Sequence, residues 1–116
     1  MVVIQNIIND ATVDEVKLKL TCQQFMQEFD VGDSELVVRL VSPVEIQVLN
    51  KEYRSKNQVT NVLSFSSDIP LEIGETILGD VVICVDVVRE EAVLAGKAFS
   101  DHLSHIAIHG LSLIHI

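Results

Sequence analysis

The chain has no tryptophan, one tyrosine, two cysteines and two prolines among its 116 residues. With so few aromatic side chains, we expect no extended stacking platform for single-stranded nucleic acid. No apolar run reaches the roughly 20 residues that cross a bilayer, and the first residues lack the basic segment of a secretion signal. Basic residues are also scarce, because 8 of them face 17 acidic ones for a net charge of −9. The composition therefore argues against membrane insertion and against general binding to phosphate backbones.

Hydrophobic residues make up 48% of the chain. That share, at this length, predicts one folded domain over residues 1–116. Cys22 and Cys84 lie far apart, each among apolar neighbours, and we interpret them as buried free thiols. A disulfide or a thiolate metal site is the less favoured alternative.

Apolar patterns and capping residues predict four strands, at 2–8, 34–41, 61–65 and 77–85. They also predict four helices, which follow the N-cap candidates Thr12, Ser42, Asp86 and Ser100. In the first helix, the expected buried stripe contains Val13, Val16, Leu20, Phe25, Met26 and Phe29. The order β-α-β-α-β-β-α-α indicates an α+β (α/β-like) fold, a small mixed four-stranded sheet with helices packed on it. The segment 66–75 reads as a turn, too short for a helical crossover, so the last two strands should be antiparallel.

All four histidines fall in the last 15 residues, at positions 102, 105, 109 and 115. His105 and His109 are four residues apart and share one face of a helix, where two imidazoles can ligate zinc. This spacing is a weak signal without the Glu of an H-E-x-x-H motif. Surface or core histidines satisfied by backbone partners are the alternative that spacing alone favours.

Two further features could carry chemistry. Residues 51–56 hold Lys51, Arg54 and Lys56, and this segment sums to +2 within a chain of −9. A local basic loop on an acidic body suits focused phosphate recognition, and a solvated turn is the alternative. Within the apolar strand at 77–85, Gly79 predicts a bulge or a close approach, and Asp80 needs a partner. Asp80 is either a satisfied structural carboxylate or a group that orients a metal-bound imidazole.

Three stretches together resemble the YbeY family of bacterial proteins: Y-R at 53–54 with T-N-V-L-S-F at 60–65, L-G-D-V-V-I at 78–83, and H-I-A-I-H-G at 105–110. The resemblance covers about residues 35–110. The family is described as metal-dependent single-strand endoribonucleases that mature ribosomal RNA. The resemblance implies ribosomal RNA and the ribosome as partners, a cytoplasmic location, zinc as the cofactor, and no small-molecule cofactor.

By the same resemblance, Arg54 is the catalytic and substrate-binding residue, Lys56 binds substrate, and His109 is a zinc ligand. Asp80 and His105 take supporting or structural roles. The family signature is H-G-x-L-H-L-x-G-Y-D-H, with three zinc-ligating histidines. His109 and Gly110 match its start, but Leu113 stands at the second histidine.

The third histidine of the signature would fall beyond Ile116. His115 does not substitute, because it lies about 240° around a helix from His109. We therefore expect the chain to be incomplete at its C-terminal end, with residues 111–116 foreign to the family. Leu111, Leu113, Ile114 and Ile116 should then form a frayed apolar end.

Three hypotheses follow. The first is a zinc-dependent endoribonuclease of ribosomal RNA maturation, impaired in this chain because one ligand of three is present. The second is a non-catalytic chain that binds a partner or RNA through the basic loop at 51–56. The third, ranked lowest, is a metalloprotease, which the missing Glu after the first histidine disfavours.

Overall fold

The computed structural model describes residues 1–67 and 77–115. The predicted order of elements is confirmed: β1 (Val2–Asn6), α1 (Glu15–Glu28), β2 (Glu35–Val41), α2 (Pro43–Arg54), β3 (Val62–Ser66), β4 (Ile77–Cys84), α3 (Val85–Ala95) and α4 (Phe99–His115). Most of the turn predicted at 66–75 lies outside the described residues, as does the side chain of His115.

The sheet is mixed and has the spatial order β1-β2-β4-β3. β1, β2 and β4 run parallel, and β3 pairs antiparallel with β4, as the short connection predicted. β3 is therefore an edge strand, and its residue Ser64 lies opposite Val81 of β4. An edge strand leaves one row of backbone groups open to side chains from elsewhere in the chain.

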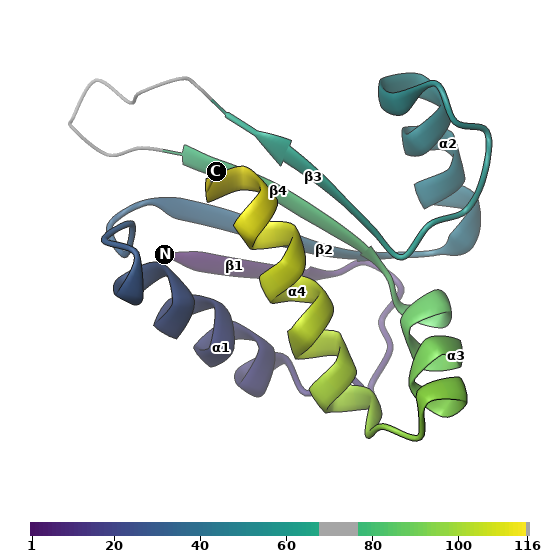
Figure 1. Cartoon of the computed structure of the whole chain (residues 1–116), viewed down its shortest axis with the longest axis horizontal. Coiled ribbons are helices and arrows are strands. Elements are labelled where there is room, and N and C mark those ends of the chain that lie inside the picture. Colours follow the sequence, from purple (N-terminus) through teal and green to yellow (C-terminus); the bar gives the residue numbers. More distant parts are fainter. Residues whose placement is uncertain (68–76, 116) are drawn as a thin grey trace.

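Helices cover both faces of the sheet. The larger core lies between one face and the helices α1, α3 and α4, and β2 and β4 contribute to it the residues Leu36, Val38, Leu40, Val81 and Ile83. A smaller core on the other face joins α2 to β3 and β4 through Ile46, Leu63 and Val82. Figure 1 shows α4 crossing in front of the strands with α1 beside it. α2 lies apart from these helices, near the end of β3 that is opposite its arrowhead.

The first helix differs from its prediction in both its cap and its buried face. Its N-cap is Asp14, whose carboxylate accepts from the Lys17 backbone N–H, so the prediction of Thr12 as the cap was wrong. The buried residues are Leu18, Cys22 and Met26. Val16 and Leu20, placed in the stripe by the prediction, are 70% and 59% exposed. Leu20 lies about 200° around the helix from Leu18, so both cannot face the sheet.

The other helix starts are partly as predicted. Ser42 caps α2, and its hydroxyl accepts from the Glu45 N–H at 3.2 Å. α3 begins at Val85 after Cys84, so Asp86 lies in its first turn and is not its cap. α4 begins at Phe99, which places Ser100 inside the helix. In both helices the chain turns helical before the polar residue that was expected to cap it.

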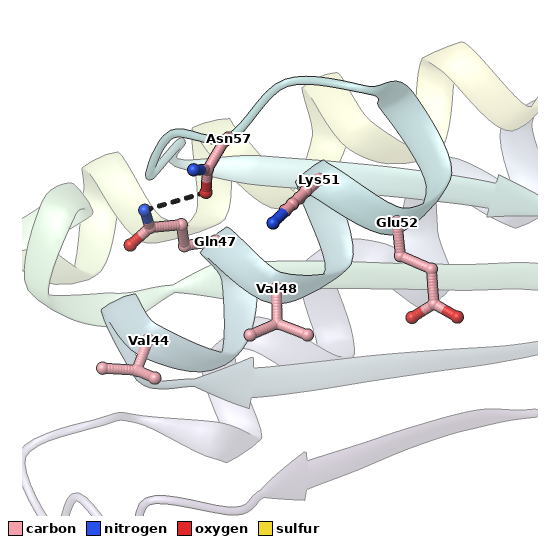
Figure 2. Close-up of a pocket in the computed structure, with 6 residues that line it drawn as sticks. All are labelled: Val44, Gln47, Val48, Lys51, Glu52 and Asn57. Carbon is pink, nitrogen blue, oxygen red and sulfur yellow. Dashed lines mark hydrogen bonds between the residues drawn. The ribbon is translucent and has the colours of Figure 1, made fainter.

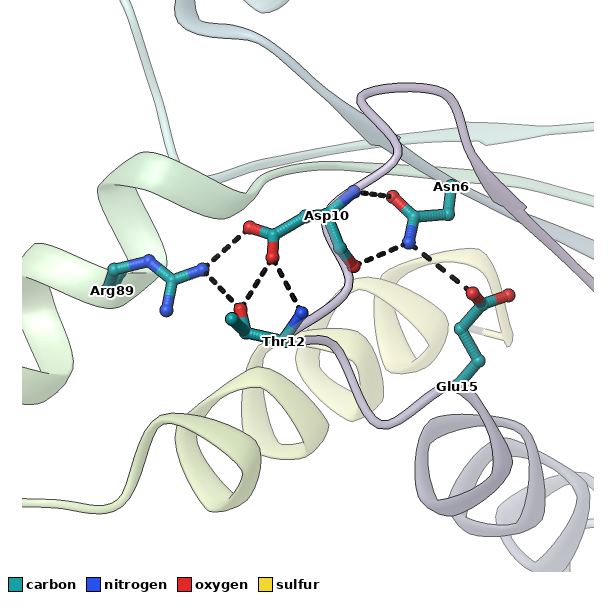
Figure 3. A network of polar contacts seen from close by, with 5 residues as sticks. All are labelled: Asn6, Asp10, Thr12, Glu15 and Arg89. Atoms are coloured by element: carbon teal, nitrogen blue, oxygen red, sulfur yellow. Dashed lines mark hydrogen bonds and ion pairs between the residues drawn. The ribbon is translucent and has the colours of Figure 1, made fainter.

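The segment between β1 and α1 is tied to α3 by a polar network (Figure 3). Arg89 of α3 donates to the Asp10 carboxylate at 2.7 Å and to the Thr12 hydroxyl at 2.9 Å. Asn6 and Asp10 exchange two hydrogen bonds, and Asn6 also donates to Glu15. Hydrogen bonds from the side chain and backbone of Thr12, aided by Arg89, lower the pKa of Asp10. Thr12 therefore serves this network and not the helix cap.

Both cysteines are buried and free, as predicted. Burial raises the pKa of the Cys22 thiol to about 11. Burial is also the main cause that raises the pKa of Cys84. Both thiols are therefore protonated at neutral pH and poorly suited to nucleophilic or metal chemistry.

Candidate phosphate-binding site beside strand β3

Arg54, the last residue of α2, is held against the open edge of β3. Its Nη2 donates to the Ser64 carbonyl at 2.6 Å, and its Nη1 donates to the Tyr53 carbonyl at 3.2 Å. The guanidinium also lies over the Phe65 ring, 5.0 Å from its centroid. The side chain is still exposed, so its other N–H groups face solvent. An arginine fixed in this way is prepared to bind an anion with little further loss of side-chain freedom.

Ser64 connects Arg54 to α4. Its carbonyl accepts from Arg54, and its hydroxyl donates to the Gly110 carbonyl at 2.8 Å. α4 comes very close to the sheet at this point. A Cβ on Gly110 would lie 2.8 Å from the Val81 side chain and 3.0 Å from that of Val62. The residue after His109 is thus docked on the strand that holds Arg54.

A groove of about 320 Å³ lies between β3 and the last turns of α4. It is lined by Arg54, Val62, Leu63, Ser64, Ser66, Leu113 and Ile114. Leu113, at the position of the second histidine in the family signature, thus shares a groove with Arg54. The expectation of a frayed apolar end was wrong for Leu111, which is fully buried, and Ile114 packs against the core.

The histidines of α4 are in different surroundings. His105 and His109 are exposed, whereas His102 is buried. The rings of His102 and His105 stack with centroids 6.1 Å apart. In residues 1–67 and 77–115, no three His, Cys, Asp or Glu side chains form a group that could hold a metal ion. The described residues therefore do not fit the three-ligand zinc site that the resemblance implies.

His102 belongs to a contact that the sequence did not single out. Its Nε2 lies 3.1 Å from a Glu91 carboxylate oxygen, and Asn61 donates to the same carboxylate at 3.3 Å. These three residues join α4, α3 and the segment that leads into β3. The sequence gives only a weak indication of this contact. His102 lies two helical turns before His109 and next to the buried Leu103, which places it near the covered face of the helix. His102 is therefore a core histidine, but the backbone partners expected for it are absent among the described residues: its Nε2 faces a carboxylate, and its buried Nδ1 has no hydrogen-bond partner there.

The prediction of a basic loop at 51–56 was wrong in part, because Lys51 and Arg54 lie in the last turn of α2, and Lys51 lines an open hollow on the outer face of that helix (Figure 2). The hollow measures about 540 Å³ and is lined by Val44, Gln47, Val48, Lys51, Glu52 and Asn57. Gln47 donates to Asn57 at 3.2 Å across its rim. Lys56 is exposed, so it and Lys51 add positive charge near Arg54 without a fixed geometry.

Asp80 lies on the α2 side of the sheet, with its carboxylate 2.9 Å from Arg39 Nη2. Its neighbour Val81 faces α4, so the sheet separates Asp80 from the helix that carries His109. Of the two roles considered, this placement favours the structural one. The predicted irregularity is present, since the β2–β4 register shifts beside Leu78. Gly79 has φ +147°, and a Cβ there would lie 2.1 Å from the Phe65 carbonyl oxygen.

The fold and this site define an α+β protein with an exposed arginine held at a sheet edge. The family model described as Endoribonuclease YbeY matches residues 3–116. A protein named Endoribonuclease YbeY from Ruthia magnifica subsp. Calyptogena magnifica is 54% identical over 111 residues, covering 96% of this chain and 77% of the relative. One of the same name from Pseudomonas syringae pv. syringae (strain B728a) is 46% identical over 98 residues, covering 84% and 58%. The chain belongs to the endoribonuclease YbeY family.

The fold is also that of a solved relative. The solution structure of a Thermotoga maritima protein matches with a TM-score of 0.65 and 25% identity, covering 100% of this chain and 73% of that one. In the described part of the chain, no helix combines the length and the apolar character that a membrane span requires. Whether residues 111–116 are foreign to the family stays a prediction.

Proposed function

We propose that this chain binds single-stranded RNA with a backbone phosphate at Arg54, and that ribosomal RNA in the cytoplasm is its substrate. The fixed guanidinium beside β3 is the observation that carries the proposal. A planar guanidinium can donate two parallel hydrogen bonds to phosphate oxygens, and it stabilises the charge that develops when a phosphodiester is cleaved. Lys51 and Lys56 add attraction for the neighbouring phosphates.

Cleavage by this chain is expected to be weak. In the family, zinc supplies an activated water, and the chain's described residues contribute His109 but no second or third ligand. RNA binding without efficient cleavage is therefore the second candidate function. It is favoured because contacts with β3 fix Arg54, whereas the described residues do not supply the three zinc ligands. Peptide hydrolysis ranks below both, as the family assignment is to RNA cleavage.

Substitution of Arg54 tests the proposal. Arg54→Ala should weaken binding to a fluorescein-labelled single-stranded RNA by about 10- to 100-fold, because a hydrogen bond to a charged group contributes roughly 1.5–3 kcal/mol. The slope of log K against log salt should also fall by about 0.7 for each phosphate that the protein no longer neutralises. Arg54→Lys keeps the charge without the paired donors, so its RNA affinity should lie between those of Arg54→Ala and the unmodified chain. Fluorescence anisotropy at several salt concentrations measures the affinities and the slopes of all three proteins.

Lys97→Ala is the matched control, because it removes one exposed positive charge between α3 and α4. Equal affinities for Arg54→Ala and the unmodified chain would refute the phosphate site. Cleavage of the same RNA, measured on a gel alongside the metal content of the purified chain, separates the two candidate functions. Stoichiometric zinc with efficient cleavage would overturn the binding-only function. Co-sedimentation with ribosomal subunits tests the ribosome as a partner.

A further inference from the structure

A second cavity lies on the α2 side of the sheet, next to the phosphate site. It measures about 260 Å³ and is lined by Arg39, Leu49, Tyr53, Phe65, Asp80 and Val82. Phe65 connects the two places, since its ring lines this cavity and lies beneath the Arg54 guanidinium. A strand whose phosphate contacts Arg54 could therefore place an adjacent base beyond Phe65. Cavities for drug-sized ligands usually measure about 300–1,000 Å³. The smaller volume of this cavity suits one planar ring system.

The walls of the cavity provide aromatic and apolar surface. The rings of Tyr53 and Phe65 meet edge to face, with centroids 5.3 Å apart and planes at 71°. Tyr53 is 56% exposed, so much of its ring is free to contact a ligand. Leu49 and Val82 complete the apolar lining. Two rings do not form an extended platform, but one exposed ring is enough to stack a single base.

The polar end of the cavity offers a donor and an acceptor side by side. Arg39 and Asp80 form an ion pair at 2.9 Å, and their side chains remain 38% and 30% exposed. The Nε atom of Arg39 is buried and has no hydrogen-bond partner within the described ranges 1–67 and 77–115. The N–H groups of Arg39 outside the ion pair and the second carboxylate oxygen of Asp80 match a base edge on which a hydrogen-bond donor lies next to an acceptor.

We propose that this cavity binds one unpaired base of the RNA strand next to the phosphate at Arg54, without selecting among the bases. The inference rests on the proposed function, because Arg54 must hold the strand. Tyr53 stacks on the base, Asp80 accepts from an N–H donor on the base edge, and Arg39 donates to the acceptor beside it.

Binding of labelled hexanucleotides tests the subsite without requiring cleavage. The unmodified chain should bind oligo(A), oligo(C) and oligo(U) about tenfold more tightly than an abasic hexamer of the same charge. Asp80→Asn should weaken binding of the three base-bearing hexamers about threefold, because a neutral amide accepts from the base less strongly than a carboxylate. Tyr53→Leu should weaken all three about tenfold, whereas Tyr53→Phe should retain affinity within about twofold. Phe29→Leu, at a half-exposed ring that follows α1, is the control and should change nothing.

The outcomes separate the two proposals. If Tyr53→Leu and Asp80→Asn bind as the unmodified chain does while Arg54→Ala is weakened, the base subsite is refuted and the phosphate site stands. If Arg54→Ala also binds normally, the proposed function fails. Should a variant not fold, NMR titration of the unmodified chain with CMP and with ribose 5-phosphate, which has no base, decides. Larger shifts around Tyr53 with CMP support the subsite, and equal or absent shifts overturn it.

Discussion

Arg54 and His109 lie on the two helices that flank β3, and the chain supports them to different degrees. The Arg54 guanidinium has a backbone carbonyl and an aromatic ring to fix it, both supplied by β3. His109 is exposed, and the residue one helical turn after it is Leu113. The half of the site around Arg54 is thus completed by contacts within the described chain, whereas the half around His109 offers one matching imidazole. Binding and cleavage should therefore respond separately to substitution.

The largest effect should come from breaking the contact between the two halves at Gly110. Gly110→Ala places a methyl group 2.8 Å from the Val81 side chain and 3.1 Å from the Ser64 hydroxyl. Overpacking at a buried contact costs about 1–3 kcal/mol, so the free energy of unfolding should fall by that amount. Urea denaturation measures it. Leu113→Ala, at a 53% exposed position of the same helix, should cost much less. Similar midpoints for Gly110→Ala and the unmodified chain would contradict the close docking.

The next prediction adds a second imidazole beside His109, the half of the site that has too few metal ligands. Leu113→His places a second histidine one turn after His109. Zinc should then raise the thermal midpoint, with a stabilisation that reaches about 2.7 kcal/mol only when free zinc is 100 times Kd. The unmodified chain should show little zinc-dependent shift. Scanning calorimetry with zinc and with EDTA measures both, and an equal rise in the two chains would contradict the expected shortage of ligands.

Ser64 tests the link between the halves more gently. Ser64→Ala removes the hydroxyl that donates to the Gly110 carbonyl, which should cost about 1 kcal/mol of stability. RNA affinity should fall only a fewfold, because the backbone carbonyl that holds Arg54 remains. Ser112→Ala removes a hydroxyl bonded within α4 and serves as the control. A loss of RNA binding as large as that of Arg54→Ala would assign Ser64 a direct role with substrate.

The smallest effect concerns Asp10, remote from both halves. The folded state lowers the pKa of Asp10 from 3.8, so its ionised form stabilises the fold above that pH. This contribution should be lost as the pH falls through the folded-state pKa. Asp10→Asn should therefore cost roughly 0.5–1 kcal/mol at pH 7 and progressively less as the pH falls toward 2. Urea denaturation at both pH values measures the difference. Asp33→Asn, at an exposed position, is the matched control.

Local sequence signals determined the order of the elements and several of their ends. Ser42 before Pro43 predicted the start of α2, and the short link after β3 predicted the antiparallel pair. Gly79 predicted the irregularity in β4. These predictions succeeded because a cap, a turn or a bulge depends on residues close together in the chain. Arg54 and His109 entered as candidates through the family resemblance, whereas their surroundings required the structure.

Tertiary packing decided what local patterns left open. The buried face of α1 follows Leu18, Cys22 and Met26, because the sheet and α4 together select which apolar residues are covered. Asp80 pairs with Arg39, which is 41 residues away, on the face of the sheet opposite α4. Ser64 accepts from Arg54 and donates to Gly110, which is 46 residues further along the chain. Such contacts depend on which strands become neighbours and which side chains share a face, so no short stretch of sequence contains them.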